Sequence, residues 1–122
     1  MAGPLSGIKI VEFAGIGPGP FCGMILADLG AEVIRIDRAS QHGQGNSIDF
    51  QHRSKSSLSA DLKNPKTIVE IKKLLSSVDG LIEGFRPGVM ERLGLGPEEC
   101  LKINSNLAVS YTHLTLPTII TV

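Results

Sequence analysis

Residues 8–38 read IKIVEFAGIGPGPFCGMILADLGAEVIRIDR, and this stretch decides the fold of the 122-residue chain. The apolar run Ile8–Phe13 predicts a strand, because a strand covered on both faces of a parallel sheet is hydrophobic almost throughout. A turn rich in glycine and proline follows, then a helix predicted over Phe21–Leu29 and ended by Gly30, then a strand over Glu32–Ile36. This order predicts a β-α-β unit, which places a nucleotide-like ligand at the carboxyl ends of its strands.

The remainder of the chain continues to alternate between strand and helix patterns. Ala39–Lys55 is polar and rich in Gly, Ser and Gln, so we expect a surface segment without regular structure. Further strands are predicted over Ser57–Leu62, Gly80–Phe85 and Leu107–Tyr111, and further helices begin at Pro65, Pro87 and Pro97. The alternation predicts an α/β fold, the N-terminal part of a doubly wound, Rossmann-like parallel sheet in an incomplete domain.

The composition excludes several classes of partner. Twelve basic and twelve acidic side chains cancel, so we expect neither nucleic-acid nor membrane binding. No apolar run approaches the roughly 20 residues that span a bilayer, and the N-terminus lacks a secretory signal pattern. Cys22 and Cys100 are isolated, which favours buried thiols over a disulfide or a metal site. We expect no metal and a cytoplasmic protein, or a peroxisomal or mitochondrial one in a eukaryote.

The glycines after the first strand match a dinucleotide-binding pattern only in part. That pattern, G-x-G-x-x-G, needs a third small residue and an acidic residue about twenty positions further on. Gly15, Gly17 and Asp37 fit it, but Pro20 occupies the third position. Pro18 and Pro20 also remove two backbone N–H donors that a pyrophosphate would use. The pattern therefore disfavours a nicotinamide cofactor.

Basic residues follow several of the predicted strands. Arg38 and Lys63 lie after the second and third strands, Arg86 lies after the fourth, and Arg92 lies one helix further on. Because the carboxyl ends of parallel strands share one edge of a sheet, Arg38, Lys63 and Arg86 are expected to form a cationic crescent. Such a crescent suits an adenosine phosphate with a pyrophosphate arm. Each residue alone is more commonly a solvated charge, and their repeated position at strand ends favours the phosphate site.

Three segments carry a resemblance to a known enzyme family. They are PLSGIKIVEFAGIGPGPFCGMILADLGAEVIRIDR at 4–38, ADLK at 60–63 and LIEGFRPGVMERLGLGPEECL at 81–101. Together they resemble the family III CoA-transferase (CaiB/BaiF-like) superfamily, and within it the α-methylacyl-CoA racemases. The resemblance runs from Pro4 to about Leu107 and implies a large α/β domain that holds CoA at its strand ends.

The resemblance also implies the binding residues. In the family, the positions that match Arg38, Ala60, Asp61, Leu62 and Lys63 contact CoA. The positions that match Gly84, Phe85, Arg86 and Arg92 contact CoA in related transferases. The resemblance further implies an acyl-CoA thioester as partner, no cofactor beyond the CoA moiety of the substrate, and an intertwined homodimer.

The reaction implied is inversion at the α-carbon of a 2-methylacyl-CoA. The thioester carbonyl acidifies the α C–H, one residue removes the proton, and another returns a proton on the opposite face. In the family these residues are a histidine in a Gly-His-Asp motif and a later aspartate. The chain contains no Gly-His-Asp motif, so we expect no catalytic residue in it and no activity from it alone.

The last residues depart from the family pattern. The family continues into a Thr/Ser-Gly-x-Gly-Gln stretch, whereas this chain reads VSYTHLTLPT over Val109–Thr118. One frame of a common transposase-type sequencing adapter encodes that segment. We therefore predict that 1–108 is the N-terminal portion of a CoA-binding domain and that 109–122 is a translated adapter. A genuine strand is the alternative.

Two other functions stay open at this point. A related family III enzyme transfers CoA between carboxylic acids through an aspartyl anhydride, and the segments present here do not separate it from a racemase. A nonenzymatic nucleotide-binding module is the alternative of another class. Binding of CoA or of NAD discriminates between the enzyme fragment and the module.

Overall fold

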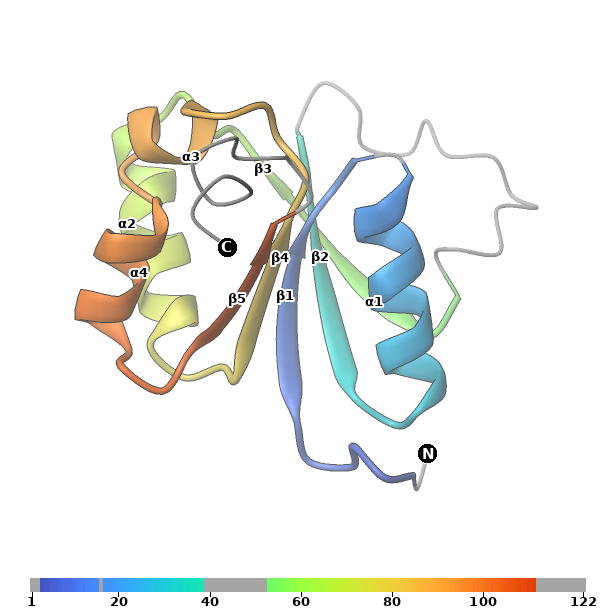
Figure 1. Cartoon of the computed structure of the whole chain (residues 1–122). Helices are drawn as coiled ribbons and strands as arrows, with labels where there is room; N and C mark the ends of the chain where they lie inside the picture. Colours follow the sequence, from blue (N-terminus) through green and yellow to red (C-terminus); the bar gives the residue numbers. More distant parts are fainter. Residues whose placement is uncertain (1–2, 16, 39–52, 112–122) are drawn as a thin grey trace, which may run out of the picture.

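The computed structural model describes residues 3–15, 17–38 and 53–111 of the chain. Strands and helices alternate along these residues (Figure 1). In chain order the elements are β1 (Lys9–Phe13), α1 (Pro18–Asp28), β2 (Glu32–Arg38), β3 (Lys55–Ala60), α2 (Pro65–Leu75), β4 (Gly80–Glu83), α3 (Val89–Arg92), α4 (Pro97–Ile103) and β5 (Ala108–Tyr111). The predicted α/β fold is confirmed.

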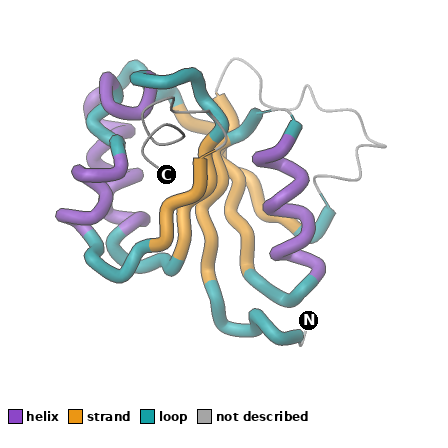
Figure 2. The backbone as a smooth tube through the Cα atoms, viewed as in Figure 1, coloured by secondary structure: helices purple, strands orange, loops and turns teal. Residues whose placement is uncertain are grey.

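The described strands form one parallel, five-stranded sheet in the order β3-β2-β1-β4-β5. β1 pairs with β2 on one side and with β4 on the other, so that Ile10 lies opposite both Val33 and Gly80. Along the chain, β2 and β3 are added on one side of β1, and β4 and β5 are then added on its other side. α1 covers one face of the sheet, and α2, α3 and α4 cover the opposite face (Figures 1 and 2). This is the doubly wound arrangement that the sequence predicts.

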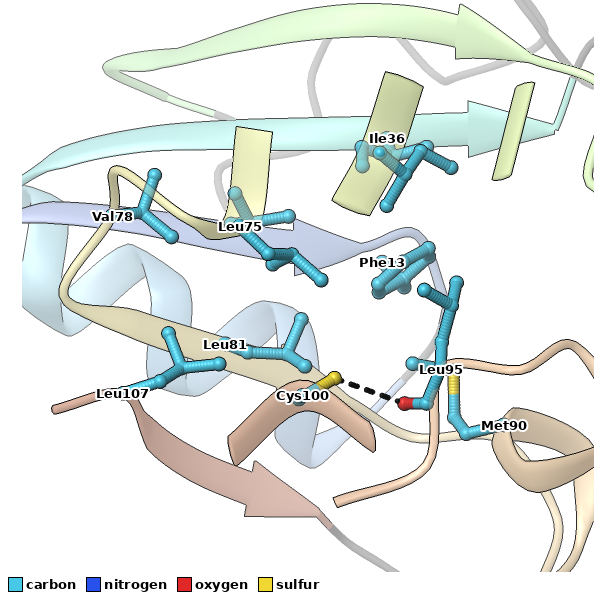
Figure 3. Close-up of a cluster of buried hydrophobic side chains, with 11 residues drawn as sticks. Phe13, Ile36, Leu75, Val78, Leu81, Met90, Leu95, Cys100 and Leu107 are labelled. Atoms are coloured by element: carbon cyan, nitrogen blue, oxygen red, sulfur yellow. Dashed lines mark hydrogen bonds between the residues drawn. The ribbon is translucent and has the colours of Figure 1, made fainter. Parts of the chain in front are cut away.

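The larger hydrophobic core lies between the sheet and helices α2, α3 and α4 (Figure 3). Its buried members are Val11, Phe13, Ile36, Ile71, Leu75, Val78, Leu81, Met90, Leu95, Cys100 and Leu107. On α2, Ile71 and Leu75 are buried one turn apart while Lys66 and Lys73 are exposed, as the helical spacing predicts. Full burial of a large aliphatic side chain contributes about 1.5–3 kcal/mol, so this layer makes the larger apolar contribution.

A smaller core lies beneath α1. Its buried members are Ile10, Ala27, Ala31, Val33 and Ile82. Side chains alternate between the two faces of a strand, so Val11 and Phe13 join the larger core while Ile10 and Glu12 face α1. The face that α1 covers is therefore partly apolar and partly charged.

Several predicted boundaries are wrong by a few residues. α1 begins three residues earlier than predicted, at Pro18, because proline suits the first helical turn, where no N–H is needed. β2 continues through Arg38, and β3 and β4 end at Ala60 and Glu83, two residues before their predicted ends. Lys55 begins β3 and its side chain is buried, whereas the sequence places it in a surface segment.

Both cysteines are free thiols, and the predicted burial is confirmed for Cys100 but only in part for Cys22. Cys100 is fully buried, and its Sγ donates to the Leu95 carbonyl at 3.2 Å. Cys22 is half-buried against the smaller core. No helix in the described ranges is long and apolar enough to cross a membrane. The predicted surface segment at 39–52 and the tail at 112–122 lie outside the described residues.

Candidate functional site

The predicted binding segments lie at one edge of the sheet, where the carboxyl ends of the parallel strands meet. Ala14 and Gly15 leave β1, Asp61 leaves β3, and Gly84 leaves β4. β1 and β4 are neighbours from which the chain runs to opposite sides, so the gap between them is the topological switch point. Ligands of open α/β sheets bind outside the strand ends at such a point.

The segment after β3 is ordered by its own hydrogen bonds. Asp61 accepts a bond from the Lys63 backbone N–H at 3.0 Å, and its carbonyl accepts one from Asn64 at 3.1 Å. The Asn64 side chain then caps α2 by accepting from the Lys66 N–H at 3.0 Å. Leu62 packs against the larger core. Lys63 is left exposed on a well-defined turn.

Arg38 is the last residue of β2, and its backbone pairs in register with Ala60 of β3. The structure thus brings the backbones of these two predicted binding residues side by side. The prediction that Arg38 belongs with Ala60–Lys63 at one edge is consistent with this register.

The segment after β4 combines a core contact with exposed charge. Glu83 is buried and accepts a hydrogen bond from the Phe85 N–H at 2.8 Å. The Phe85 ring lies 5.8 Å from the Phe13 ring at a tilt of 57°, so the side chain of Phe85 closes the larger core. Gly84 and Arg86 are exposed beside it.

Arg92 lies one short helix further along the chain, at the end of α3. It is exposed, like Lys63 and Arg86. None of these three cations forms an ion pair with another described residue. They are therefore available to a phosphate, although no side-chain hydrogen bond or ion pair joins Arg92 to the strand-end segments among the residues that the structure describes.

The structure disfavours a dinucleotide at the β1–α1 turn. Pro18 and Pro20 both lie in the first turn of α1, where they supply no N–H donor. Asp37, which matches the ribose-binding position, is buried and held in two contacts by Arg35. Arg35 Nε lies 2.9 Å from Asp37 Oδ1, and Nη2 donates to Oδ2 at 3.0 Å. The acidic residue is thus already engaged within β2.

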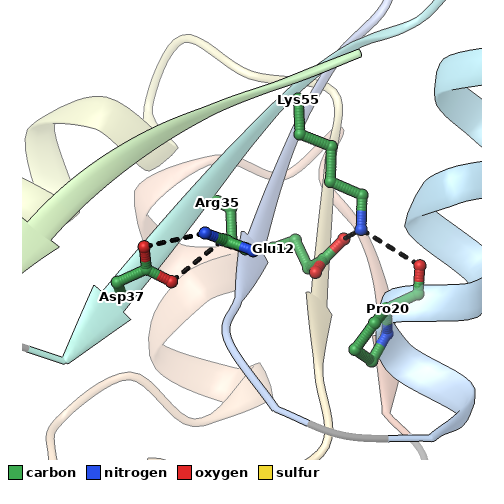
Figure 4. Close-up of polar contacts among 5 residues, drawn as sticks. All are labelled: Glu12, Pro20, Arg35, Asp37 and Lys55. Atoms are coloured by element: carbon green, nitrogen blue, oxygen red, sulfur yellow. Dashed lines mark hydrogen bonds and ion pairs between the residues drawn. The ribbon is translucent and has the colours of Figure 1, made fainter. Parts of the chain in front are cut away.

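A buried ion pair beneath α1 is the main feature that sequence reasoning missed (Figure 4). Glu12 is wholly buried, and the Lys55 side chain is only 1% exposed. Lys55 Nζ lies 2.7 Å from Glu12 Oε1 and donates to the Pro20 carbonyl at 3.0 Å. Burial raises the pKa of the Glu12 carboxyl, and the positive charges of Lys55 and Arg35 offset this only in part. The one feature of the sequence that could have predicted this pair is Glu12 itself, an acidic residue within the otherwise largely apolar run Ile8–Phe13.

Gly23 makes room for this pair. A Cβ built at Gly23 would lie 1.8 Å from Glu12 Oε1 and 3.1 Å from Lys55 Nζ. Only a residue without a side chain lets α1 approach the sheet over the carboxylate. The glycine is therefore required by packing against the pair and not by backbone conformation.

Comparison with known proteins agrees with this fold. A family model described as CoA-transferase family III matches residues 5–113. The chain belongs to CoA-transferase family III. A crystal structure of a hypothetical protein from Mycobacterium tuberculosis superimposes on it with a TM-score of 0.80 at 33% identity, covering 90% of this chain and 33% of that one. Members of the family are enzymes that act on CoA thioesters.

Two relatives show the breadth of the family. Alpha-methylacyl-CoA racemase of Mus musculus is 47% identical over 103 residues, which are 84% of this chain and 26% of the relative. Succinyl-CoA–D-citramalate CoA-transferase of Chloroflexus aurantiacus is 35% identical over 116 residues, 85% of this chain and 29% of the relative. The chain therefore spans between about a quarter and a third of the length of these relatives.

Gly23→Ala is expected to destabilise this family III chain. The overpacking against Glu12 costs about 1–3 kcal/mol, which outweighs the gain of about 1 kcal/mol in helix propensity. Thermal unfolding followed by circular dichroism measures the difference. Gly19→Ala is the matched control, because its Cβ would meet only Ile82 Cγ2 at an ordinary 3.9 Å. Equal stability of the two variants would contradict the role of Gly23.

The raised pKa of Glu12 predicts a definite pH dependence of stability. Between its ordinary value of 4.5 and the raised folded value, the folded state binds more protons than the unfolded state. The contribution of this group to stability is therefore present at low pH and is lost as the pH rises through that window. Urea unfolding across the window should show wild-type stability falling relative to Glu12→Gln. Glu98→Gln, at an exposed glutamate, controls for the lost charge, and a relative rise with pH would refute the expectation.

Proposed function

We propose that this chain is the CoA-thioester-binding portion of an α-methylacyl-CoA racemase-like enzyme. The observation that carries the proposal is the 47% identity to the mouse racemase over 103 residues, which are 84% of this chain. In the parent reaction, the α-proton of a 2-methylacyl-CoA leaves from one face and a proton returns on the other. The residues that move these protons are proposed to lie outside the 122 residues, so the chain alone is inactive.

The roles of the strand-end residues follow from the chemistry of CoA. CoA carries a ribose phosphate and a pyrophosphate, which suit charged donors. Arg38 and Lys63 are assigned to the phosphates, with Ala60–Lys63 supplying backbone and side-chain contacts to the adenosine end. Arg86 and Arg92 are assigned further contacts with CoA.

A CoA-transferase is the second candidate. The 35% identity to succinyl-CoA–D-citramalate CoA-transferase favours it, and the same edge would hold CoA in either enzyme. The full gene decides between them. A histidine and an aspartate as an acid–base pair indicate the racemase, whereas a nucleophilic aspartate without that histidine indicates the transferase.

Titration of the chain with CoA and with NAD tests the proposed ligand. We expect CoA to bind, and Arg38→Ala, Lys63→Ala or Arg86→Ala to weaken binding about tenfold or more, since a hydrogen bond to a charged group contributes about 1.5–3 kcal/mol. Lys73→Ala is the control, because this exposed lysine lies in the last turn of α2. Binding of NAD without CoA would favour the nonenzymatic nucleotide-binding module instead.

We also propose that residues 109–122 are a translated adapter. Residues 109–111 pair with β4 as part of β5, but ladder hydrogen bonds are made by the backbone and accept many sequences at a sheet edge. Sequencing the gene from its source should show a Gly-x-Gly-Gln continuation after the strand. The sequence VSYTHLTLPT in the genomic copy would overturn the proposal.

A further inference from the structure

Three elements meet at one buried ammonium. Lys55 lies at the start of the edge strand β3, and its side chain reaches past β2 to Glu12 of β1 and to the Pro20 carbonyl of α1 (Figure 4). The side chains of Lys55 and Glu12 are 1% and 0% exposed. In this setting each charge needs the other, because removing one partner of a buried pair leaves an uncompensated charge.

The first turn of α1 is tied to the sheet through one of its own carbonyls. Pro18 and Pro20 have no N–H, and the Phe21 N–H bonds to the Gly17 carbonyl at a long 3.3 Å. Gly17, the N-cap residue, has a φ of +81° and no side chain with which to cap the helix. No side chain caps the helix at Gly17, so the bond from Lys55 Nζ to the Pro20 carbonyl is the side-chain contact that fixes this turn from outside the helix.

That turn stands at the carboxyl end of β1, beside the switch point. If the adenosine end of CoA lies at the ends of β2 and β3, the pantetheine arm leads along the same edge toward β1 and β4. Gly17 and the first turn of α1 then lie where the arm passes, beside the segment after β4. Their position relative to the sheet is set by what holds that first turn.

We propose that Lys55 is a positioning residue. Its ammonium, balanced by Glu12, holds the first turn of α1 against the sheet, so that Gly17 and this first turn receive the pantetheine arm of a CoA thioester. The ligand in this statement rests on the proposed function. The mechanical part, the anchoring of the turn, does not.

The chain offers a matched control at the other end of the same helix. Arg53, just before β3, pairs with Asp28 at the end of α1, with Nε 3.0 Å from Oδ1. This pair also ties α1 to the segment that leads into β3, but it is largely exposed and far from the first turn. Removing it tests whether any ion pair on α1 has the same effect.

The test compares the wild-type 122-residue chain with two double variants, Glu12→Gln/Lys55→Met and Asp28→Asn/Arg53→Gln. Both replace an ion pair by neutral groups of similar size, which a buried site commonly tolerates. The measurements are hydrogen exchange at the Phe21 amide and binding of CoA and of adenosine 3′,5′-bisphosphate. In the Lys55 variant we expect about tenfold faster exchange and about tenfold weaker CoA binding, with the bisphosphate within twofold of wild type.

The outcomes separate this inference from the proposed function. Equal weakening of both ligands, unchanged CoA binding, or the same changes in the Arg53 variant would overturn the positioning role. If the wild type binds neither ligand, the proposed function fails, and Phe21 exchange still decides whether Lys55 anchors the turn. Should the double variant not fold, Lys55→Arg, which keeps a cationic donor, is expected to retain wild-type exchange. Fast Phe21 exchange in folded Lys55→Arg would contradict the anchor.

Discussion

A carboxylate with no exposed surface, on the central strand β1, constrains how α1 packs on that face of the sheet. Glu12 needs a positive partner, since burying an unpaired charge costs far more than burying a paired one. Lys55 meets that need from two strands away. Gly23 must then lack a side chain, because α1 passes directly over the pair. The position of α1 and the start of β3 thus follow from one buried charge.

The two faces of the sheet are stabilised by different kinds of interaction. The face beneath α2, α3 and α4 is an apolar core in which Phe13, Leu75 and Leu81 have almost no exposed surface. The face beneath α1 has a smaller apolar cluster and, beside it, the Glu12–Lys55 pair. Apolar packing is largely non-directional, whereas an ion pair sets the distance between named atoms. The directional contacts, from Lys55 to Glu12 and to the Pro20 carbonyl, lie on the face beneath α1, and they hold the first turn of α1 beside the switch point.

The strand-end edge shows what sequence reasoning could reach. The positions of Lys63 and Arg86 after strands were predicted from the alternation of elements, because parallel strands share one carboxyl edge. The sequence also showed that the match to a dinucleotide-binding pattern is weak, since Pro18 and Pro20 lack the backbone N–H groups that a pyrophosphate would use. The ion pair between Arg35 and Asp37 could not be predicted from the sequence, because each residue has several possible partners of opposite charge along the chain.

The sequence by itself determined the α/β alternation, the parallel sheet, the buried face of α2 and the segments at the strand ends, because each follows from local periodicity and turn chemistry. Only the tertiary structure decided that Lys55 is buried and that Gly23 is a packing requirement. It also showed that Phe85 closes the core with its ring against Phe13. The physical reason is that charge pairing and close packing join residues far apart in the chain, and their partners exist only once the strands have taken their order and register.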